Sequence, residues 1–314
     1  MMKNRRKIEE VREIYNKPLL ELVYDAASVH RRFHSPEKIK ISTLISVKTG
    51  ECIEDCAYCA QSLHYDTGIK PQKIMSTGEV IEKAMKAKKS GATRICLSTS
   101  WRNAEGNENI ENIIEMAKEV QKLDMDVCCT LGMVNKENAA KLLKAGISGY
   151  NHNLDTSRNF YPEIITTRTY DARLETINNL IDAGMPYCSG GIIGMGESNE
   201  DRINLLHTLA TQKKHPFNFP VNALVPVKGT PLENQPLVSV WEIVRMIATA
   251  RIILPESNIS LAAGRINMTQ EGQALCFLAG ANSVFIGEKL LTTANTKIED
   301  DIKLFEILGL KDEN

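Results

Sequence analysis

The sequence has almost no excess charge and no long apolar run. Its 38 lysines and arginines are balanced by 39 aspartates and glutamates, which gives a formal net charge of -1. This balance does not indicate nucleic acid or a membrane surface as the main partner. No apolar run approaches the roughly 18 residues of a membrane-spanning helix. The first 32 residues are charged and lack the apolar core and cleavage site of a signal peptide, so we expect a cytoplasmic protein.

Linkers, low-complexity segments and a dinucleotide fingerprint are also missing. No Pro/Gly/Ser-rich stretch interrupts the 314 residues, and GxGxxG does not follow the first predicted strand. Eight cysteines are present, but in a reducing compartment they are not expected to form a disulfide framework. They are expected instead to be free thiols, metal ligands or redox groups.

Short β-branched or apolar runs alternate along the chain with longer amphipathic stretches. The predicted strands are residues 39–46, 93–98, 126–131, 148–153, 187–190, 219–224, 258–261 and 283–286. The predicted helices are residues 77–90, 109–123, 136–145, 170–183, 199–211, 238–254 and 270–279. Three helices are followed by glycine, at Gly91, Gly146 and Gly184, where a left-handed C-cap is needed.

Repeated strand–helix units predict an α/β fold with parallel strands and right-handed crossovers. Eight units within about 250 residues fit a closed (βα)8 TIM barrel, with a doubly wound open sheet as the alternative. We expect residues 1–38 to form an N-terminal helical extension, residues 39–292 the barrel and residues 293–314 a short C-terminal tail. The three parts are expected to make a single structural domain.

Three cysteines are concentrated in GECIEDCAYCAQS, residues 50–62. Cys52, Cys56 and Cys59 follow the first predicted strand, on the kind of loop that carries barrel active sites. Thiolates favour zinc, Cu(I) and iron–sulfur clusters. Three ligands suit a 4Fe–4S cluster in which one iron has no protein ligand and can hold a small molecule. The alternative is a zinc site completed by His64, although zinc loops usually carry two CxxC-like pairs.

Three further cysteines lie on separate predicted strands. Cys96, Cys128 and Cys188 belong to the second, third and fifth strands, and alternate residues of a barrel strand point inward. Successive strands could therefore bring the three thiols to one interior point, although any one of them alone would fit a buried core position. Cys129 is expected to face the helices, and Cys276 is expected in the core.

A row of polar residues follows the fourth predicted strand in YNHNLDTS. Asn151, Asn153 and Asp155 are spaced by two and share one face while the chain stays extended. Two amides and a carboxylate suit a polar, uncharged ligand and ribose hydroxyls, whereas the alternative is a solvated loop or a helix cap. Asn222 ends the sixth strand and is expected at the same mouth. The glycines of residues 189–197 would let backbone approach a ligand closely.

Together these stretches resemble a known family. The CxxxCxxC spacing, with Tyr58 before the last cysteine, resembles the radical S-adenosylmethionine (SAM) enzymes. From about residue 38 to residue 293 the chain resembles the biotin synthase family through CIEDCAYCAQS, TRICLSTSW, CTLG, YNHNLDTS, IITTRTYDARL, CSGGIIGMGE, VKGTPL, AAGR and ALCFLAGANSVF. The order of these stretches makes coincidence improbable.

The resemblance implies four groups of site residues and assigns no side chain as the catalyst. A 4Fe–4S cluster is implied at Cys52, Cys56 and Cys59, with SAM on its open iron. A 2Fe–2S cluster is implied at Cys96, Cys128, Cys188 and Arg265. SAM binding is implied for Tyr58, Asn153, Asp155, Arg173 and Ile192. Dethiobiotin binding is implied for Asn151, Asn153 and Asn222.

The resemblance also implies the reaction and its partners. SAM is cleaved to methionine and a 5′-deoxyadenosyl radical, which removes hydrogen from an unactivated carbon of dethiobiotin. Sulfur from the 2Fe–2S cluster then captures that carbon, and a second round closes the ring to give biotin. A homodimer, a flavodoxin-type electron donor and the iron–sulfur assembly machinery are implied as partners.

Several alternatives remain open from the residues alone. Arginine has no accessible lone pair, so Arg265 could instead balance the charge of an anionic cluster. A related barrel enzyme resembling the hydrogenase maturases, an iron–sulfur sensor and a zinc-stabilised binding module are the other functions considered. The polar row at Asn151, Asn153 and Asp155 argues against a sensor, which needs no substrate pocket.

Overall fold

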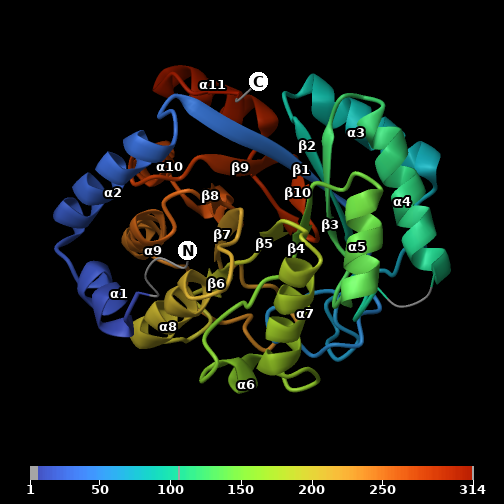
Figure 1. Ribbon diagram of the computed structural model, residues 1–314, viewed down its shortest axis with the longest axis horizontal. Coiled ribbons are helices and arrows are strands. Elements are labelled where there is room, and N and C mark those ends of the chain that lie inside the picture. The colour runs from blue at the N-terminus through green and yellow to red at the C-terminus, as the bar shows by residue number, and fades with distance from the viewer. Residues whose placement is uncertain (1–5, 105–106, 313–314) are drawn as a thin grey trace.

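Parallel strands form a closed barrel surrounded by helices (Figure 1). The computed structural model describes residues 6–104 and 107–312. The barrel strands are β1 (Lys38–Lys48), β2 (Arg94–Thr99), β3 (Asp126–Thr130), β4 (Gly149–Asn151), β5 (Tyr187–Cys188), β7 (Asn218–Ala223), β8 (Asn258–Leu261) and β9 (Ser283–Ile286). Strand β9 returns to pair in parallel with β1, with Lys40 opposite Ser283. The TIM barrel prediction is therefore confirmed, and the open-sheet alternative is wrong.

Seven helices follow the strands at the predicted places. They are α3 (Thr77–Lys89), α4 (Asn107–Gln121), α5 (Lys136–Lys144), α7 (Tyr170–Asp182), α8 (Asn199–Ala210), α9 (Val240–Ile253) and α10 (Gln270–Leu278). Each predicted strand and helix boundary lies within two residues of the observed one. Local chemistry explains this accuracy, because side chains such as Ser76, Thr169 and Ser198 cap helix N-termini by accepting backbone N–H bonds.

The fifth strand is interrupted by glycines. After Cys188 the strand is interrupted, and the chain continues into a second short strand, β6 (Gly191–Ile193), which also pairs with β7. A Cβ on Gly190 would lie 2.1 Å from the Pro220 carbonyl oxygen, and one on Gly191 would lie 2.7 Å from the Asp155 carbonyl oxygen. These glycines therefore allow neighbouring protein backbone to approach, where the sequence had suggested close approach of a ligand.

Segments near both ends of the chain pack against the helices and the first strand of the barrel. Helices α1 (Ile8–Tyr15) and α2 (Leu19–Phe33) pack against α8 and α9, and α11 (Ile298–Leu308) packs against α10. Strand β12 (Lys311–Asp312) pairs in parallel with the start of β1. A short hairpin, β10 (Lys289–Leu290) and β11 (Thr293–Ala294), spans the predicted boundary between barrel and tail.

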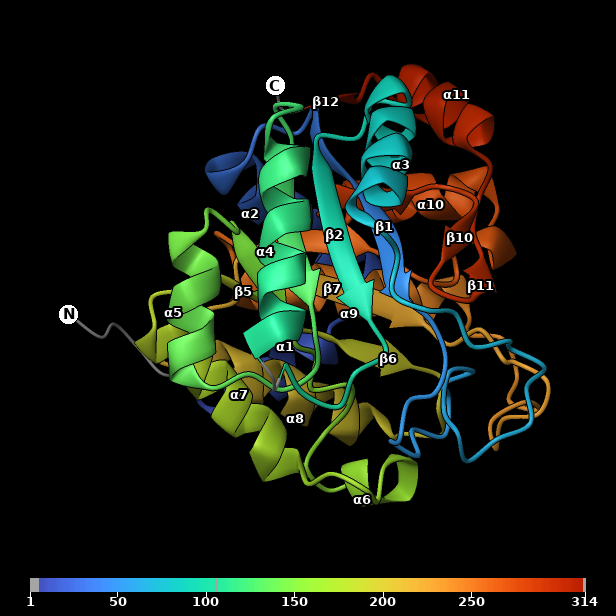
Figure 2. The ribbon, with the colours of Figure 1, turned by 90° about the vertical axis from the view of Figure 1, so that its right-hand side faces the viewer.

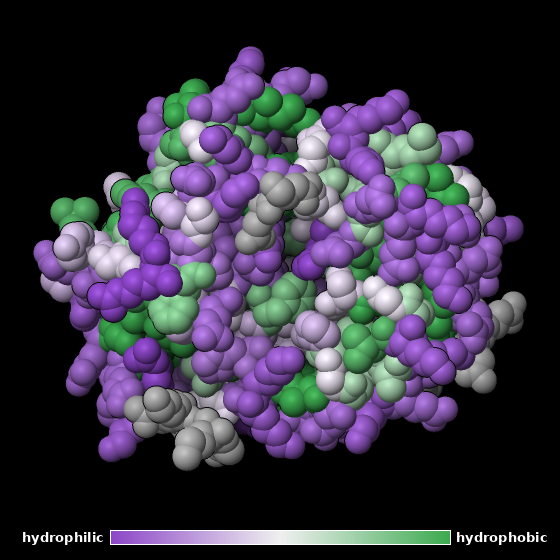
Figure 3. All heavy atoms as spheres, turned by 45° about the horizontal axis from the view of Figure 1, so that its top comes forward, coloured by the Kyte–Doolittle hydropathy of each residue, from purple (hydrophilic) through white to green (hydrophobic). Residues whose placement is uncertain are grey.

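Two different interiors result from this arrangement. The apolar core lies mainly between the sheet and the helices, and it includes Cys129 and Cys276, both fully buried as expected. The space inside the barrel is more polar and contains the other strand cysteines. Hydrophilic side chains cover most of the surface face in Figure 3, with apolar side chains in separate patches. Among the described residues, no helix combines the length and apolarity needed to cross a membrane.

Candidate active site

A cavity of about 690 Å³ occupies the barrel interior and the loops at the carboxyl ends of its strands. Figure 2 shows the arrowheads of β1 and β2 pointing towards these loops. The predicted site residues that line the cavity are Cys52, Cys56, Tyr58, Cys59, Cys96, Cys128, Asn151, Asn153, Asp155, Arg173, Cys188, Ile192 and Asn222. Arg265 is not among the residues that line it. Four residues of the β10–β11 hairpin region, 290–293, border the same cavity.

The three-cysteine loop is folded by backbone hydrogen bonds and by contacts with the segment after α6 (Tyr161–Ile164). The Cys52 N–H donates to the Gln61 carbonyl at 2.9 Å, and the Cys59 N–H donates to the Cys56 carbonyl at 2.9 Å. The Asp55 carboxylate accepts the backbone N–H groups of Thr166 and Thr167 at 2.9 and 3.1 Å. The loop is thus held in place by protein contacts that do not use the cysteine sulfurs.

The thiols of this loop are neutral in the metal-free chain. Burial raises the pKa of Cys56 to about 12 and that of Cys59 to about 11, and it also raises the pKa of Cys52. A thiolate needs a positive charge to be stable in such a site, and a bound metal supplies one. Cluster binding must therefore displace these protons.

Asp155 joins the polar row to the three-cysteine loop. Its carboxylate accepts the Tyr58 hydroxyl at 2.7 Å and pairs with the Arg173 guanidinium at 2.5 Å. Arg173 also donates to the Tyr161 hydroxyl and to the Asn153 carbonyl, at 2.8 and 2.6 Å. Asp155 is 3% exposed, so the alternative of a solvated loop is wrong. Its φ of 67° is unusual for a residue other than glycine.

Backbone groups orient the side-chain amides of Asn153 and Asn222. The Asn153 side-chain oxygen accepts the Gly190 N–H at 3.1 Å. The Asn222 amide donates to the Gly191 carbonyl at 3.1 Å and accepts the Ala263 N–H at 3.2 Å. These bonds fix which end of each amide faces the cavity. Each amide still has hydrogen-bonding capacity for a ligand, because it carries two donors and two lone pairs.

His152 and Arg168 of the cavity wall escaped the sequence analysis, whereas Thr99 belongs to Ser98-Thr99-Ser100, a stretch that the family resemblance implies beside SAM. His152 Nε2, Arg168 Nε and Thr99 Oγ1 are buried, line the cavity and have no hydrogen-bond partner. Buried polar atoms are normally paired, so these atoms mark where polar ligand groups fit. Burial lowers the pKa of His152 well below its usual range, so this imidazole is neutral. Arg168 lies in the quoted stretch IITTRTYDARL, but no local pattern separates it from a surface arginine.

The three strand cysteines line the same cavity, and two of them are in contact. Cys96 and Cys128 are direct partners in the register of β2 and β3, and Cys188 pairs with Asn151 on β4 and Asn218 on β7. A hydrogen bond from the Cys128 thiol lowers the pKa of Cys96, while the same contact raises the pKa of Cys128. Burial raises the pKa of Cys188 to about 12. The arrangement is a buried group of thiols with the chemistry of an iron–sulfur ligand set.

Arg265 lies outside this group and its guanidinium is engaged elsewhere. It begins the 3-10 helix η1 (Arg265–Asn267) and is fully buried. Both terminal nitrogens contact the Asp301 carboxylate on α11, and Nε donates to the Gln273 side chain at 3.0 Å. A further bond joins it to the Phe285 carbonyl at 3.1 Å. These contacts balance the buried charge of Arg265 in this structure, and its role as an iron ligand or as a counter-charge stays a prediction.

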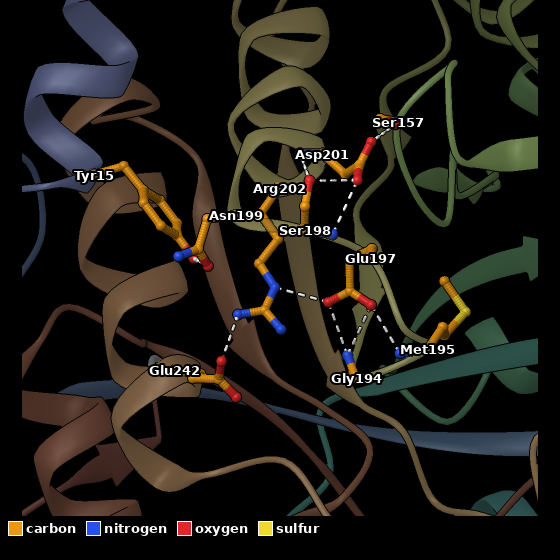
Figure 4. A network of polar contacts seen from close by, with 10 residues as sticks. All are labelled: Tyr15, Ser157, Gly194, Met195, Glu197, Ser198, Asn199, Asp201, Arg202 and Glu242. Carbon is orange, nitrogen blue, oxygen red and sulfur yellow. Dashed lines mark hydrogen bonds and ion pairs between the residues drawn. The ribbon is translucent and has the colours of Figure 1, made fainter. Parts of the chain in front are cut away.

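The turn after β6 is fixed by a polar network (Figure 4). The Glu197 carboxylate accepts the N–H groups of Gly194 and Met195 and the Arg202 Nε, at distances from 2.7 to 3.1 Å. Asp201 completes the cap of α8 and accepts the Ser157 hydroxyl at 2.6 Å. The network thereby ties the loop after β6 to the loop after β4, and the loop after β4 carries His152, Asn153 and Asp155 of the cavity wall.

The zinc alternative receives no support from His64. Its Nε2 contacts the Ile53 carbonyl at 3.1 Å. Across residues 6–104 and 107–312, no three His, Cys, Asp or Glu side chains converge on a single metal ion.

Comparison with known proteins places the chain in a family. The radical SAM superfamily model matches residues 46–209, and the Biotin and Thiamin Synthesis associated domain matches residues 220–311. A biotin synthase of Cytophaga hutchinsonii is 55% identical over 303 residues, which are 96% of this chain and 90% of that protein. A mitochondrial biotin synthase of Arabidopsis thaliana is 54% identical over 303 residues, 96% of this chain and 80% of that protein.

Solved structures share the fold at lower identity. A methylornithine synthase has a TM-score of 0.82 at 19% identity, covering 99% of this chain and 95% of its own. An FeFe-hydrogenase maturase from Carboxydothermus hydrogenoformans has a TM-score of 0.83 at 17% identity, covering 98% of this chain and 76% of its own. At these identities the likeness concerns the fold alone, so the full-length relatives decide the family. The chain belongs to the biotin synthase family of the radical SAM superfamily.

Proposed function

We propose that the chain converts dethiobiotin to biotin by inserting sulfur inside the barrel cavity. Membership of the family makes it a radical SAM enzyme of biotin synthesis, a class that uses SAM and a 4Fe–4S cluster. The observation that supports this proposal most directly is that one cavity is lined by two separate groups of cysteine thiols and by a row of polar side chains. A binding protein or a single metal site would not need this combination.

Cys52, Cys56 and Cys59 would hold the 4Fe–4S cluster. These residues fit it, because they are three free thiols on a loop that protein contacts keep in place. When bound, the cluster and SAM supply the radical that removes hydrogen from an unactivated carbon, which no side chain can do. Tyr58, Asp155 and their neighbours would then bind and orient SAM.

Two arginines and the polar row would position the ligands. The buried Nε of Arg168 can donate to the SAM carboxylate, while Arg173 holds Asp155 in place and keeps further N–H donors. Asn153 and Asp155 suit the SAM ribose, and Ile192 supplies an apolar contact. The amides of Asn151, Asn153 and Asn222 suit the ureido group of dethiobiotin, since each amide both donates and accepts.

The protein also limits access of water to the reacting groups. The cavity is enclosed by barrel strands on its sides, and residues 290–293 border it from the β10–β11 hairpin. Excluding water protects reactive intermediates from side reactions. The hairpin is thus proposed to cover the bound ligands.

Cys96, Cys128 and Cys188 would hold a 2Fe–2S cluster that donates the sulfur. Their fit rests on their lining one cavity of the barrel as free thiols, with Cys96 and Cys128 adjacent on neighbouring strands. Arg94 brings a positive charge to the same part of the cavity, and this charge acts on both Cys128 and Cys188. Arg94 is itself paired with Asp126 at 3.0 Å, as Arg265 is paired with Asp301, so Arg265 stays the proposed fourth residue of this cluster site, as a ligand or as its counter-charge.

The partners are inferred from the family resemblance. They are a flavodoxin-type electron donor, the iron–sulfur assembly machinery and a second copy of the chain, in the cytoplasm. Exposed apolar side chains on α2 and α9 support self-association, namely Leu20, Tyr24 and Trp241, which are 80%, 71% and 58% exposed.

The test is anaerobic reconstitution with iron and sulfide, followed by incubation with SAM, a reductant and dethiobiotin. We expect one 4Fe–4S and one 2Fe–2S cluster per chain, and formation of both biotin and 5′-deoxyadenosine. Deoxyadenosine without biotin would show that the substrate is wrong. A protein that retains zinc alone would contradict the whole proposal.

A further inference from the structure

Asn218 lies directly beside one of the strand cysteines. Its side-chain Nδ2 donates a hydrogen bond to the Cys188 sulfur at 3.0 Å, and the two residues are register partners on β7 and β5. Asn218 is buried, with 7% of its surface exposed. The bond therefore forms in an environment of low dielectric, where hydrogen bonds to sulfur are stronger than in water.

The orientation of this amide is set from the next strand. Ser260 on β8 is fully buried and donates its hydroxyl to the Asn218 side-chain oxygen at 2.7 Å. The oxygen end of the amide thus faces a donor, and the amino end is left for the sulfur. A reversed amide would place its amino group against the serine hydroxyl and its oxygen against the sulfur. The Ser260 bond satisfies the amide oxygen in the donating orientation, and a thiolate, which has no proton to donate, favours the same orientation.

The bond to Cys188 differs from the surroundings of the other two strand cysteines. Cys96 contacts the Thr130 hydroxyl at 3.7 Å and the Cys128 thiol. Cys96 and Cys128 are therefore hydrogen-bonding partners of each other. Cys188 instead has an amide donor that carries no charge. An amide can only donate to sulfur through its N–H, so the contact favours an electron-rich sulfur.

We propose that Asn218, oriented by Ser260, is a positioning residue that donates a hydrogen bond to the Cys188 thiolate of the 2Fe–2S cluster. The proposal rests on the function proposed above, because it requires that cluster. Hydrogen bonds to the sulfurs are among the factors that set cluster reduction potentials. A donor stabilises the more negative, reduced state more than the oxidised one, so Asn218 raises the potential and eases reduction as sulfur leaves.

The experiment compares the reduction potential of the 2Fe–2S cluster in the reconstituted protein and its variants. Asn218→Leu keeps the branching of the side chain at a larger volume and removes the donor, and Ser260→Ala releases the amide. We expect Asn218→Leu to disfavour reduction about tenfold, which for a one-electron couple is about 59 mV towards negative potential. Ser260→Ala should shift the potential in the same direction by less. Absorbance and electron paramagnetic resonance report the cluster independently of biotin formation.

The matched control is Ser283→Ala, which removes a buried hydroxyl one strand further along the sheet, opposite Ser260. Its potential should equal that of the parent protein. If Asn218→Leu does not load the second cluster, Ser260→Ala decides the question, since it leaves Asn218 in place.

The outcomes separate the inference from the proposed function. A parent protein that loads the 4Fe–4S cluster but no 2Fe–2S cluster overturns the proposed function and the inference with it. A parent with both clusters, and a Ser260→Ala or Asn218→Leu protein of unchanged potential, overturns the inference alone. A shift of similar size in Ser283→Ala would also overturn it, because the effect would then be general.

Discussion

At the residue scale, two buried arginines of the cavity have different roles. The Arg173 guanidinium contacts Asp155, Tyr161 and the Asn153 carbonyl, so its main role is to hold other protein groups in place. Arg168 is equally buried but keeps an Nε with no partner facing the cavity region. A buried N–H of a charged group that lacks a partner costs free energy, and an anionic ligand recovers it.

Arg168→Gln should weaken SAM binding by about tenfold or more, because a hydrogen bond to a charged group contributes about 1.5–3 kcal/mol. The 4Fe–4S content should be retained. The measurement is equilibrium binding of SAM to the reconstituted protein. Arg158→Gln is the matched control, since Arg158 pairs with Asp171 on the surface. Unchanged SAM affinity in Arg168→Gln would remove Arg168 from the site.

At the element scale, one ion pair joins η1 to α11. Arg265 and Asp301 are both buried, at 0% and 2% exposure, and Thr296 also donates to the carboxylate. This ion pair connects the C-terminal helix α11 to the segment that follows β8. Removing one partner of such a pair leaves an isolated buried charge, which is strongly unfavourable.

Arg265→Met should lower the free energy of unfolding by about 3–5 kcal/mol, and Arg265→Met/Asp301→Leu should recover much of that loss. Urea unfolding of the metal-free chain measures both. Loss of the 2Fe–2S cluster in the double variant would favour Arg265 as a ligand, and assembly of that cluster would favour a role confined to the ion pair. Unchanged stability of Arg265→Met would contradict the expected contribution of the ion pair.

The two cysteine groups belong to different elements, which makes them separable. Cys128 lies on β3 inside the barrel, and Cys56 lies on the loop after β1. Cys128→Ala should remove the 2Fe–2S absorbance and biotin formation and keep the 4Fe–4S cluster. Cys56→Ala should remove the 4Fe–4S cluster and keep the 2Fe–2S cluster. Iron and sulfide analysis with absorbance spectra checks this, and loss of both clusters in Cys128→Ala would contradict separate ligand sets.

At the scale of the whole molecule, the packing of α2 on α9 makes stability depend on pH. His30 is 3% exposed and its Nε2 has no hydrogen-bond partner. Burial, helped by the charge of Arg251 and by His34 and Arg31, lowers the pKa of His30 to about 3. Burial also lowers the pKa of His34, which accepts a hydrogen bond from Arg251 at 2.8 Å.

Acid should therefore destabilise the fold. Because the folded pKa of His30 lies below the unfolded value near 6.5, the unfolded chain binds the extra proton as pH falls below about 6.5. The free energy of unfolding should fall by up to about 1.4 kcal/mol per pH unit from this group between pH ~6.5 and ~3. Urea unfolding of the reduced, metal-free chain at pH 7 and pH 5 measures it.

Between pH 7 and pH 5, the free energy of unfolding should fall by about 2 kcal/mol less in His30→Leu than in the parent protein. Ser28→Ala on the same helix is the control and should keep the parent slope. An equal slope in His30→Leu and the parent would show that other groups carry the acid sensitivity.

The sequence alone determined the order and type of the elements and most of the candidate site. Helix caps, C-terminal glycines and apolar periodicity act over a few residues, so they can be read from the chain. The spacing of Cys52, Cys56 and Cys59 and the row from Asn151 to Asp155 are equally local. The inward direction of Cys128 and the outward direction of Cys129 follow from the alternation of side chains along a strand.

Only the tertiary structure decided which distant side chains become partners. Arg265 binds Asp301 across 36 residues, Ser260 reaches Asn218 across 42, and Asn218 reaches Cys188 across 30. No local pattern encodes these pairs, because barrel closure and strand register bring them together. The same closure buries Arg168 and His152 against the cavity. Burial and partner choice, which set charge and hydrogen bonding, are properties of the folded barrel and not of any one segment.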